Sequence, residues 1–352
     1  MAVDEAKLEQ FMGQFVQDMG AAASGALVAI GDQLGLYRGL AEGPATAAEL
    51  AARTGTHERY VREWLLNQGA GGYVSWDAAA ERWFLTEEQQ FALVDEDSPA
   101  YVLGAFEVLQ AMYADAPKIA ERFRSGAGLD WGDHDHRLFG GTARFFAPGY
   151  RANLVAEWIP ALDGVEEKLR AGAKVADVGC GHGISTVLLA QAYPASTFAG
   201  FDYHAPSIEQ ARRGAAAAGV ENARFEVAAA DAFPAGQGRG YDLVAHFDCL
   251  HDLGDPVAAG RRVRETLAPD GTWMVIEPMA GDAVEDNLNP VGRIFAAAST
   301  VVCVPTSLAQ DGIALGAQAG EARLREVIEA AGFSRMRRAT ETPFNLVLEA
   351  RP

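Results

Sequence analysis

Glycines and acids stand where consecutive buried strands are expected to end. Residues 174–178 are apolar enough for a buried strand and run into a turn that contains Gly179, Gly181 and Gly183. Glycine lets the main chain bend sharply and approach a ligand closely, because it has no Cβ atom. The helical pattern after the turn would direct its first backbone N–H groups to the same place. The turn is a candidate ligand site, and by itself it is a weak signal.

Further candidates follow the next expected strands. Asp202 ends the second strand, where an acid holds the two hydroxyls of a ribose. Asp231 and Ala232 end the third strand and suit the edge and face of an adenine. Asp177, inside the first strand, and Tyr203, beside Asp202, are assigned to the same site. Together these residues predict a pocket for a nucleoside.

The glycine turn has no partners for phosphate. Its G-x-G-x-G pattern lacks the last spacing of the dinucleotide fingerprint, and no Walker A loop is present. The turn contains no lysine or arginine that could bind a pyrophosphate. A cationic nucleoside without phosphate groups fits better, and S-adenosyl-L-methionine is such a nucleoside. We therefore expect S-adenosyl-L-methionine as the donor and S-adenosyl-L-homocysteine as the product.

Two further motifs carry a resemblance. Leu250-His251-Asp252 looks like the Leu-His-Asp-Trp motif of caffeic-acid-type O-methyltransferases, with Leu253 in place of the tryptophan. Leu34-Gly-Leu-Tyr followed by Thr46-Ala-Ala-Glu resembles the N-terminal module of the same group. Over nearly its whole length, the chain resembles class I S-adenosylmethionine-dependent methyltransferases with an N-terminal winged-helix domain.

The resemblance implies roles for several side chains. His251 would be the general base and Glu277, at the end of the fifth strand, would orient it, as an acid does in a catalytic triad. Asp252 and Glu321 are expected near the acceptor, although Glu321 lies a few residues out of register with the family's second glutamate. Phe247 is assigned to the donor pocket.

The central segment carries many aromatic and histidine side chains. Trp131, Phe145 and Phe146 are expected to line the acceptor pocket, and Tyr150 to cover the donor. Around these residues the chain looks more like an actinobacterial branch of winged-helix methyltransferases. His134 and His136 stand among acids, which invites a metal interpretation. A solvated loop or a pocket lining is favoured for these two histidines. Some relatives hold a metal with the motif histidine and a second histidine in the lid, but no histidine follows His251 in this chain. We therefore expect no metal.

Methyl transfer is an in-line displacement at a sulfonium, so the enzyme must align a nucleophile and, for a hydroxyl, remove its proton. We therefore expect O-methylation of a phenolic or polyketide-like small molecule. Methylation of nitrogen or carbon, including a metal-assisted reaction on an α-keto acid, stays open. A winged-helix regulator that binds the donor without turnover is a further alternative.

The elements that must position these residues fall into three segments. Residues 1–92 predict a helical, winged-helix dimerisation domain, and residues 93–170 a helical linker that forms part of the substrate pocket. Residues 171–352 alternate strands and helices, which is typical of an α/β, doubly wound, mainly parallel Rossmann-like sheet of seven strands. The stretch 279–320 shows no clear regular structure and is expected to form a lid.

Composition excludes several classes of protein. The 352 residues carry a formal charge of −19, whereas nucleic acids and anionic membranes attract basic surfaces. Residues 45–92 hold four arginines against seven acids, so the winged helix is not expected to bind DNA. Three distant cysteines and an N-terminus without a signal-peptide pattern predict a cytoplasmic protein. The expected partners are a small-molecule methyl acceptor and a second copy of the chain, without nucleic acid or membrane.

Overall fold

The structure, a computed structural model, describes residues 3–236, 238 and 240–352 and divides into two units. The first unit comprises Met1–Gln110 with Arg144–Pro148, and the second comprises Ala111–Ala143 with Gly149–Pro352. Two helices, α6 (Gly104–Ser125) and α7 (Arg137–Asn153), contribute residues to both units.

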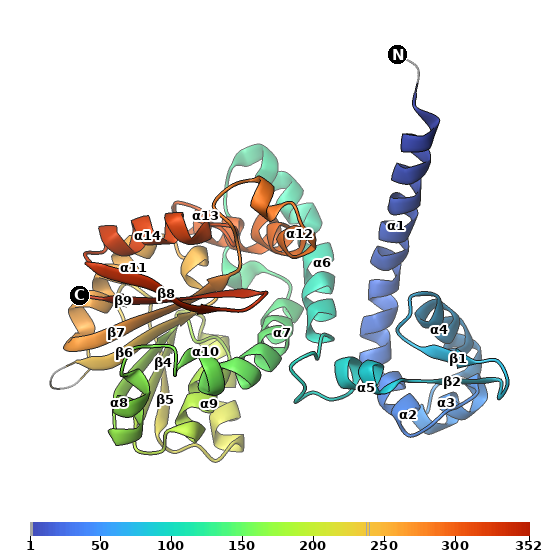
Figure 1. The fold of residues 1–352 in the computed structure, drawn as a ribbon, viewed down its shortest axis with the longest axis horizontal. Helices are drawn as coiled ribbons and strands as arrows, with labels where there is room; N and C mark the ends of the chain where they lie inside the picture. The colour runs from blue at the N-terminus through green and yellow to red at the C-terminus, as the bar shows by residue number, and fades with distance from the viewer. Residues whose placement is uncertain (1–2, 237, 239) are drawn as a thin grey trace. The chain divides into compact units, whose positions relative to one another are not determined.

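The first unit is a helical fold with a small antiparallel ribbon (Figure 1). Its elements in chain order are α1 (Glu5–Gln33), α2 (Leu36–Ala41), α3 (Ala47–Thr54), α4 (Glu58–Ala70), β1 (Ser75–Asp77), β2 (Arg82–Phe84) and α5 (Glu87–Leu93). Helix α3 begins at a capping box, in which Glu49 N donates to Thr46 Oγ1 (3.3 Å) and Thr46 N donates to Glu49 Oε2 (2.8 Å). Helices α3 and α4 with the β1–β2 ribbon form the predicted winged helix.

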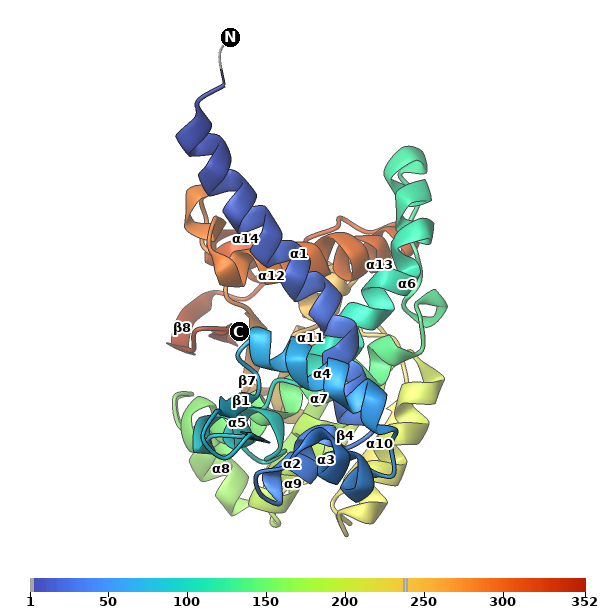
Figure 2. The same cartoon turned by 90° about the vertical axis from the view of Figure 1, so that its right-hand side faces the viewer.

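Helix α1 extends well beyond the rest of this unit (Figure 2). Its N-terminal part carries large apolar side chains that the unit does not cover. The exposed fractions of Phe11, Phe15 and Met19 are 63%, 50% and 56%. Near its other end α1 is anchored, because Trp64 Nε1 of α4 donates to Leu27 O (2.9 Å). The C-terminal part of α1 therefore packs on the rest of the unit, and its N-terminal part presents an exposed apolar surface.

The second unit is built on a seven-stranded sheet with the order β5-β4-β3-β6-β7-β9-β8. The strands are β3 (Lys174–Val178), β4 (Thr197–Asp202), β5 (Ala223–Val227), β6 (Tyr241–Phe247), β7 (Leu267–Pro278), β8 (Arg335–Glu341) and β9 (Asn345–Arg351). The first five pair in parallel with one another, and β9 pairs antiparallel with both β7 and β8. The doubly wound sheet expected from the sequence is confirmed.

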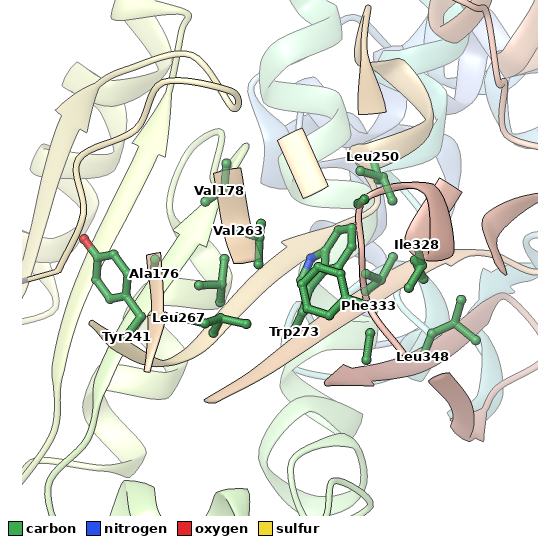
Figure 3. Close-up of a cluster of buried hydrophobic side chains, with 14 of the residues drawn as sticks. Ala176, Val178, Tyr241, Leu250, Val263, Leu267, Trp273, Ile328, Phe333 and Leu348 are labelled. Atoms are coloured by element: carbon green, nitrogen blue, oxygen red, sulfur yellow. The ribbon is translucent and has the colours of Figure 1, made fainter. Parts of the chain in front are cut away.

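Helices cover both faces of this sheet. Helices α8 (Val165–Ala171), α9 (Ile184–Ala192) and α10 (Ala205–Ala217) lie on one face, and α11 (Pro256–Thr266) and α14 (Gly320–Ala330) on the other (Figure 1). Because both faces are covered, the central strands are nearly all apolar. On the α11–α14 side, Trp273 and Phe333 pack with ring centroids 4.9 Å apart (Figure 3). This core fixes the strand ends that carry the candidate site.

The expected lid is helical where the sequence showed no clear regular structure. Helix α12 (Pro290–Ala298) continues through a π-helical turn (Ser299–Cys303) into α13 (Val304–Ala309). By length and composition alone, Pro290–Ala309 could cross a membrane. A single run of this kind is weak evidence, since a core helix of a soluble protein meets the same criteria. The run is held to the second unit by a bond from Ser307 Oγ to Leu253 O (2.8 Å).

Candidate active site

The strand order reverses between β3 and β6, which is where doubly wound sheets bind ligands, outside the carboxyl ends of the strands. The glycine turn follows β3 at this point. Gly179, Gly181 and Gly183 have φ angles of 75°, 51° and 75°, in the left-handed region that favours glycine. The sequence pattern thus corresponds to a real backbone requirement.

Two of the three glycines also prevent collisions. A Cβ on Gly179 would lie 2.5 Å from Cys249 Sγ, and a Cβ on Gly183 would lie 2.6 Å from the ring of Phe225. At Gly181, by contrast, nothing lies within 4 Å of the Cβ position. The turn therefore packs tightly at its ends and leaves space at its middle, which is the shape that a close-bound ligand needs.

Asp177 binds the start of the helix that follows the glycine turn. Its Oδ2 accepts hydrogen bonds from Ser185 Oγ and Thr186 Oγ1, both 2.6 Å long, in the first turn of α9. The other oxygen, Oδ1, is buried without a partner. Burial raises the pKa of Asp177 to about 6, against the opposing effect of the two hydroxyl bonds. The residue orients α9 and offers one free oxygen at the donor edge.

Asp202 joins the glycine turn to the end of β4. Its Oδ2 accepts from Gly181 N (2.9 Å) and its Oδ1 accepts from His204 N (2.8 Å). Burial raises the pKa of Asp202, and these two backbone bonds oppose the shift. A carboxylate has about four lone-pair sites, so two remain for the hydroxyls of a ribose.

The other donor candidates are more open. Tyr203, next to Asp202, has a partly exposed side chain, and Asp231 and Ala232 lie in an exposed turn after β5. The backbone of that turn is held by Ala232 N, which donates to Ala229 O (3.1 Å). All three lie on the β4–β5 side of the glycine turn, where the sequence placed the adenosine.

His251 and Glu277 are in direct contact. The Nδ1 atom of His251 lies 2.6 Å from Glu277 Oε2, and Leu250 N donates to Glu277 Oε1 (3.0 Å). Glu277 therefore fixes the ring orientation and the tautomer of His251, in the way that an acid orients a catalytic histidine. Residues 250–252 form a single 3₁₀ turn that begins three residues after the end of β6.

The second nitrogen of His251 faces another acid. Nε2 lies 3.1 Å from Asp252 Oδ1, a buried oxygen without an aligned hydrogen bond. Burial alone would lower the pKa of His251, but the charges of Asp252 and Glu277 raise it well above 6.5. The two neighbouring carboxylates therefore favour the charged form of the ring.

A lid residue that the sequence analysis did not single out completes this cluster. The Cys303 sulfur lies within 4.8 Å of the ligand atoms of His251 and Asp252, a set that is able to hold a metal ion. Burial raises the pKa of Cys303 to about 12, so the thiol stays neutral in this setting. Both His251 nitrogens already face carboxylates, which is the arrangement of a charged imidazolium.

A second buried cluster surrounds the end of β6. The hydroxyl of Tyr150 donates to Asp248 Oδ2 (2.8 Å), and Asn345 Nδ2 donates to Asp248 Oδ1 (2.9 Å). The ring of Tyr150 packs on Phe247, with centroids 5.5 Å apart. The structure thus brings together two of the three aromatic residues assigned to the donor, Tyr150 and Phe247. Asp248 and Asn345 were missed, and the acid at a strand end was the available signal for Asp248.

The residues assigned to the acceptor have different local surroundings. Trp131 packs on Phe139 (5.5 Å between centroids), and Phe139 packs on His204 (4.7 Å). Through Phe139, Trp131 is therefore linked to His204, which lies two residues after Asp202, the acid predicted to bind the ribose. His134 is buried and bonded through Nδ1 to Asp115 Oδ2 (2.9 Å).

The structure also gives the contacts of Phe145, Phe146 and Glu321. Phe145 and Phe146 belong to the first unit, with ring centroids 5.0 Å apart. The two Glu321 oxygens are bound by Arg325 (2.9 Å) and Arg338 (2.7 Å). Glu277, and not Glu321, is the glutamate that the structure places on His251.

Comparisons with known families agree with this architecture. Residues 169–332 match the family model of a methyltransferase domain, and residues 22–94 match an Rv2258c-like winged HTH domain. No curated protein matches the sequence.

Solved structures share the fold over nearly their whole length. The chain is 19% identical to the mitomycin 7-O-methyltransferase (TM-score 0.70), and 99% of each chain is covered. It is 17% identical to human N-acetylserotonin methyltransferase in complex with S-adenosylmethionine (TM-score 0.69; 100% of this chain and 99% of that chain). An O-methyltransferase from neocarzinostatin biosynthesis, in complex with S-adenosyl-L-homocysteine and 1,4-dihydroxy-2-naphthoic acid, is 21% identical (TM-score 0.62; 94% and 96%).

Proposed function

Because this chain is an S-adenosylmethionine-dependent methyltransferase with an N-terminal winged HTH domain, we propose that it methylates a hydroxyl group of a phenolic or polyketide-like small molecule. The donor supplies a methyl group on a cationic sulfur. The chain itself must bind the donor, exclude water and accept the proton of the acceptor hydroxyl. The relative from neocarzinostatin biosynthesis holds a dihydroxynaphthoic acid, which supports an aromatic acceptor.

The contact between His251 and Glu277 carries this proposal. A histidine whose Nδ1 is fixed by a carboxylate at 2.6 Å presents Nε2 to its surroundings. Asp252 faces Nε2 in the resting site. The ring must first lose its Nε2 proton to solvent. The acceptor hydroxyl then takes the place of Asp252 at Nε2, the neutral ring accepts the hydroxyl proton, and Glu277 stabilises the imidazolium that forms. Base catalysis of this type contributes about 10²–10⁴-fold.

The test of the reaction is incubation with labelled donor and a panel of phenols, amines and α-keto acids. Label should pass to phenolic oxygen and to no amine or keto acid. Transfer to nitrogen or carbon would overturn the hydroxyl assignment while leaving the methyltransferase assignment intact. If donor binds tightly and no acceptor in any class is labelled, a donor-binding regulator is the better description.

The rate should depend on pH through His251. Only the neutral ring accepts a proton, and the neighbouring acids raise the pKa of His251 well above 6.5. The value of kcat/KM should therefore rise with pH, with its midpoint above 6.5. Removing one of these charges with Glu277→Gln should move the midpoint to lower pH while lowering the maximal rate. Initial rates between about pH 5 and pH 10 check both expectations, and a midpoint that ignores Glu277→Gln would contradict them.

We also propose that the chain forms a homodimer through the exposed apolar face of α1. Apolar surface of this kind favours burial against a partner, at roughly 25 cal/mol per Å². Serine at Phe11, Phe15 and Leu34 should reduce the mass measured by light scattering from two chains to one. Serine at the exposed polar residues Gln10 and Gln17 of the same helix should leave the mass unchanged. A wild-type chain that is monomeric at all concentrations would refute the dimer.

A further inference from the structure

Asp248 takes no part in the roles assigned above, yet its backbone is held in a costly conformation. It directly follows β6, with a φ angle of 50°. Non-glycine residues adopt this left-handed region rarely, and residues held there cluster at functional sites. The main chain is fixed by a bond from Asp248 N to Ile276 O of β7 (2.8 Å). The turn aims the side chain inward, since only 9% of Asp248 is exposed.

The carboxyl group of Asp248 is bonded only to neutral donors. Tyr150 of α7 donates to one oxygen and Asn345 of β9 donates to the other. Of the charged groups around it, Glu277 of β7 disfavours its ionised form and His251, in the 3₁₀ turn after β6, favours it. Three elements distant in sequence thus converge on one buried acid that makes no ion pair among the described residues.

This acid borders the donor site. The next residue, Cys249, touches the glycine turn, since its Sγ lies 2.5 Å from the Cβ position of Gly179 and bonds to Val178 O (3.3 Å). The preceding residue, Phe247, packs on Tyr150. Residues 247–249 therefore connect Tyr150 with the glycine turn through direct contacts.

We propose that the Asp248 carboxylate is the counter-ion of the sulfonium, so that binding of the cationic donor expels a proton from Asp248. The proton passes to solvent, the carboxylate and the sulfonium remain as a pair, and total charge is conserved. After methyl transfer the sulfur is a neutral thioether, and Asp248 takes a proton back. The cluster thus favours the donor over the product. The inference uses the donor site of the proposed function, but neither the acceptor nor the role of His251.

The protonation of the empty site agrees with this mechanism. Burial raises the pKa of Asp248 to about 8, and the charge of Glu277 adds to the shift. The bonds from Tyr150 and Asn345 and the charge of His251 lower it only in part. At neutral pH the empty site therefore holds a neutral carboxylic acid, and a bound cation reverses that preference.

Titration calorimetry at pH 7 in buffers of different ionisation enthalpy tests the proposal. S-adenosylmethionine should release close to one proton on binding, whereas S-adenosylhomocysteine should release none. In Asp248→Asn the proton release should vanish. The Kd for the donor should rise about tenfold, which corresponds to about one pKa unit. The Kd for the product should change less than about twofold. Asparagine tolerates the left-handed backbone, so this variant should fold.

Two further variants sharpen the test. Asp255→Asn makes the same chemical change at an exposed helix cap and should alter neither affinity nor proton release. Tyr150→Phe removes a bond that favours the ionised acid and should move the proton release to higher pH. Equal proton release for donor and product, or an equal loss of affinity for both in Asp248→Asn, would overturn the proposal. Failure of methylation in the acceptor panel would leave these binding results untouched.

Discussion

Replacement of His251 by alanine is expected to lower the rate of methyl transfer by about 10²–10⁴-fold, the usual contribution of a general base. Donor affinity should stay within about twofold, because the donor candidates Gly181 and Asp202 do not bond to His251. Single-turnover rates with saturating labelled donor measure the first quantity, and calorimetry with the donor measures the second. The loss should lie in kcat, since His251 acts on the acceptor proton.

Loss of the His251 side chain leaves the buried Glu277 and the partly buried Asp252 without their charged partner, so folding must be monitored. His251→Asn keeps an N–H toward Glu277 but cannot accept the proton, and it should be as slow as alanine with a smaller decrease in Tm. His136→Ala removes a histidine side chain that is 86% exposed and should retain full activity. A folded His251→Asn protein with an undiminished rate would exclude proton transfer to this residue and favour an acceptor that needs no base.

Replacement of Asp202 by alanine should weaken donor binding by about 10²–10⁴-fold, as expected for the loss of two hydrogen bonds to the ribose hydroxyls, where each hydrogen bond to a charged group contributes about 1.5–3 kcal/mol. The sequence suggests that folding would be little affected. The bonds from Gly181 N and His204 N to the Asp202 carboxylate indicate an additional stability cost, because both N–H groups lose their acceptor. Calorimetry and thermal unfolding separate the two effects.

Asp202→Asn provides the matched variant. An amide keeps one acceptor for Gly181 N or His204 N and loses the charge and one acceptor. We expect unfolding close to that of the wild type and a donor affinity between those of wild type and alanine. Methylation at saturating donor should recover in both variants, because the base and the acceptor are untouched. An unchanged donor affinity in Asp202→Ala would refute the ribose assignment.

The donor side of the site could be predicted from sequence because its signals are local. An apolar run followed by three glycines specifies a buried strand and a turn with positive φ angles, and both are properties of consecutive residues. The pairing of His251 with Glu277 spans 26 residues but follows from the order of neighbouring parallel strands. Both predictions use the rule that doubly wound sheets bind ligands at the carboxyl ends of their strands.

The cluster around Asp248 could not be predicted in this way. Its two bonding partners stand 98 residues before it and 97 residues after it, and neither lies in a recognisable motif. The same limit applies to Cys303, which reaches His251 through the lid. Strand β8 is difficult to locate from the sequence for a different reason. Its Arg-Met-Arg-Arg start is charged, as edge strands often are, and lacks the apolar run of a central strand.

The π-helical turn at Ser299–Cys303 determines which side chain of this helix contacts His251 and Asp252. A π turn is equivalent to one residue inserted into an α-helix, and one residue corresponds to a rotation of about 100°. If this segment shortened by one residue, the helix would regain its regular pitch and every side chain on one side of the turn would rotate away from its present direction. Cys303 would then no longer lie beside His251 and Asp252, although its own side chain is unchanged. The side chain that this helix presents to His251 and Asp252 therefore depends on where the inserted residue lies along the helix.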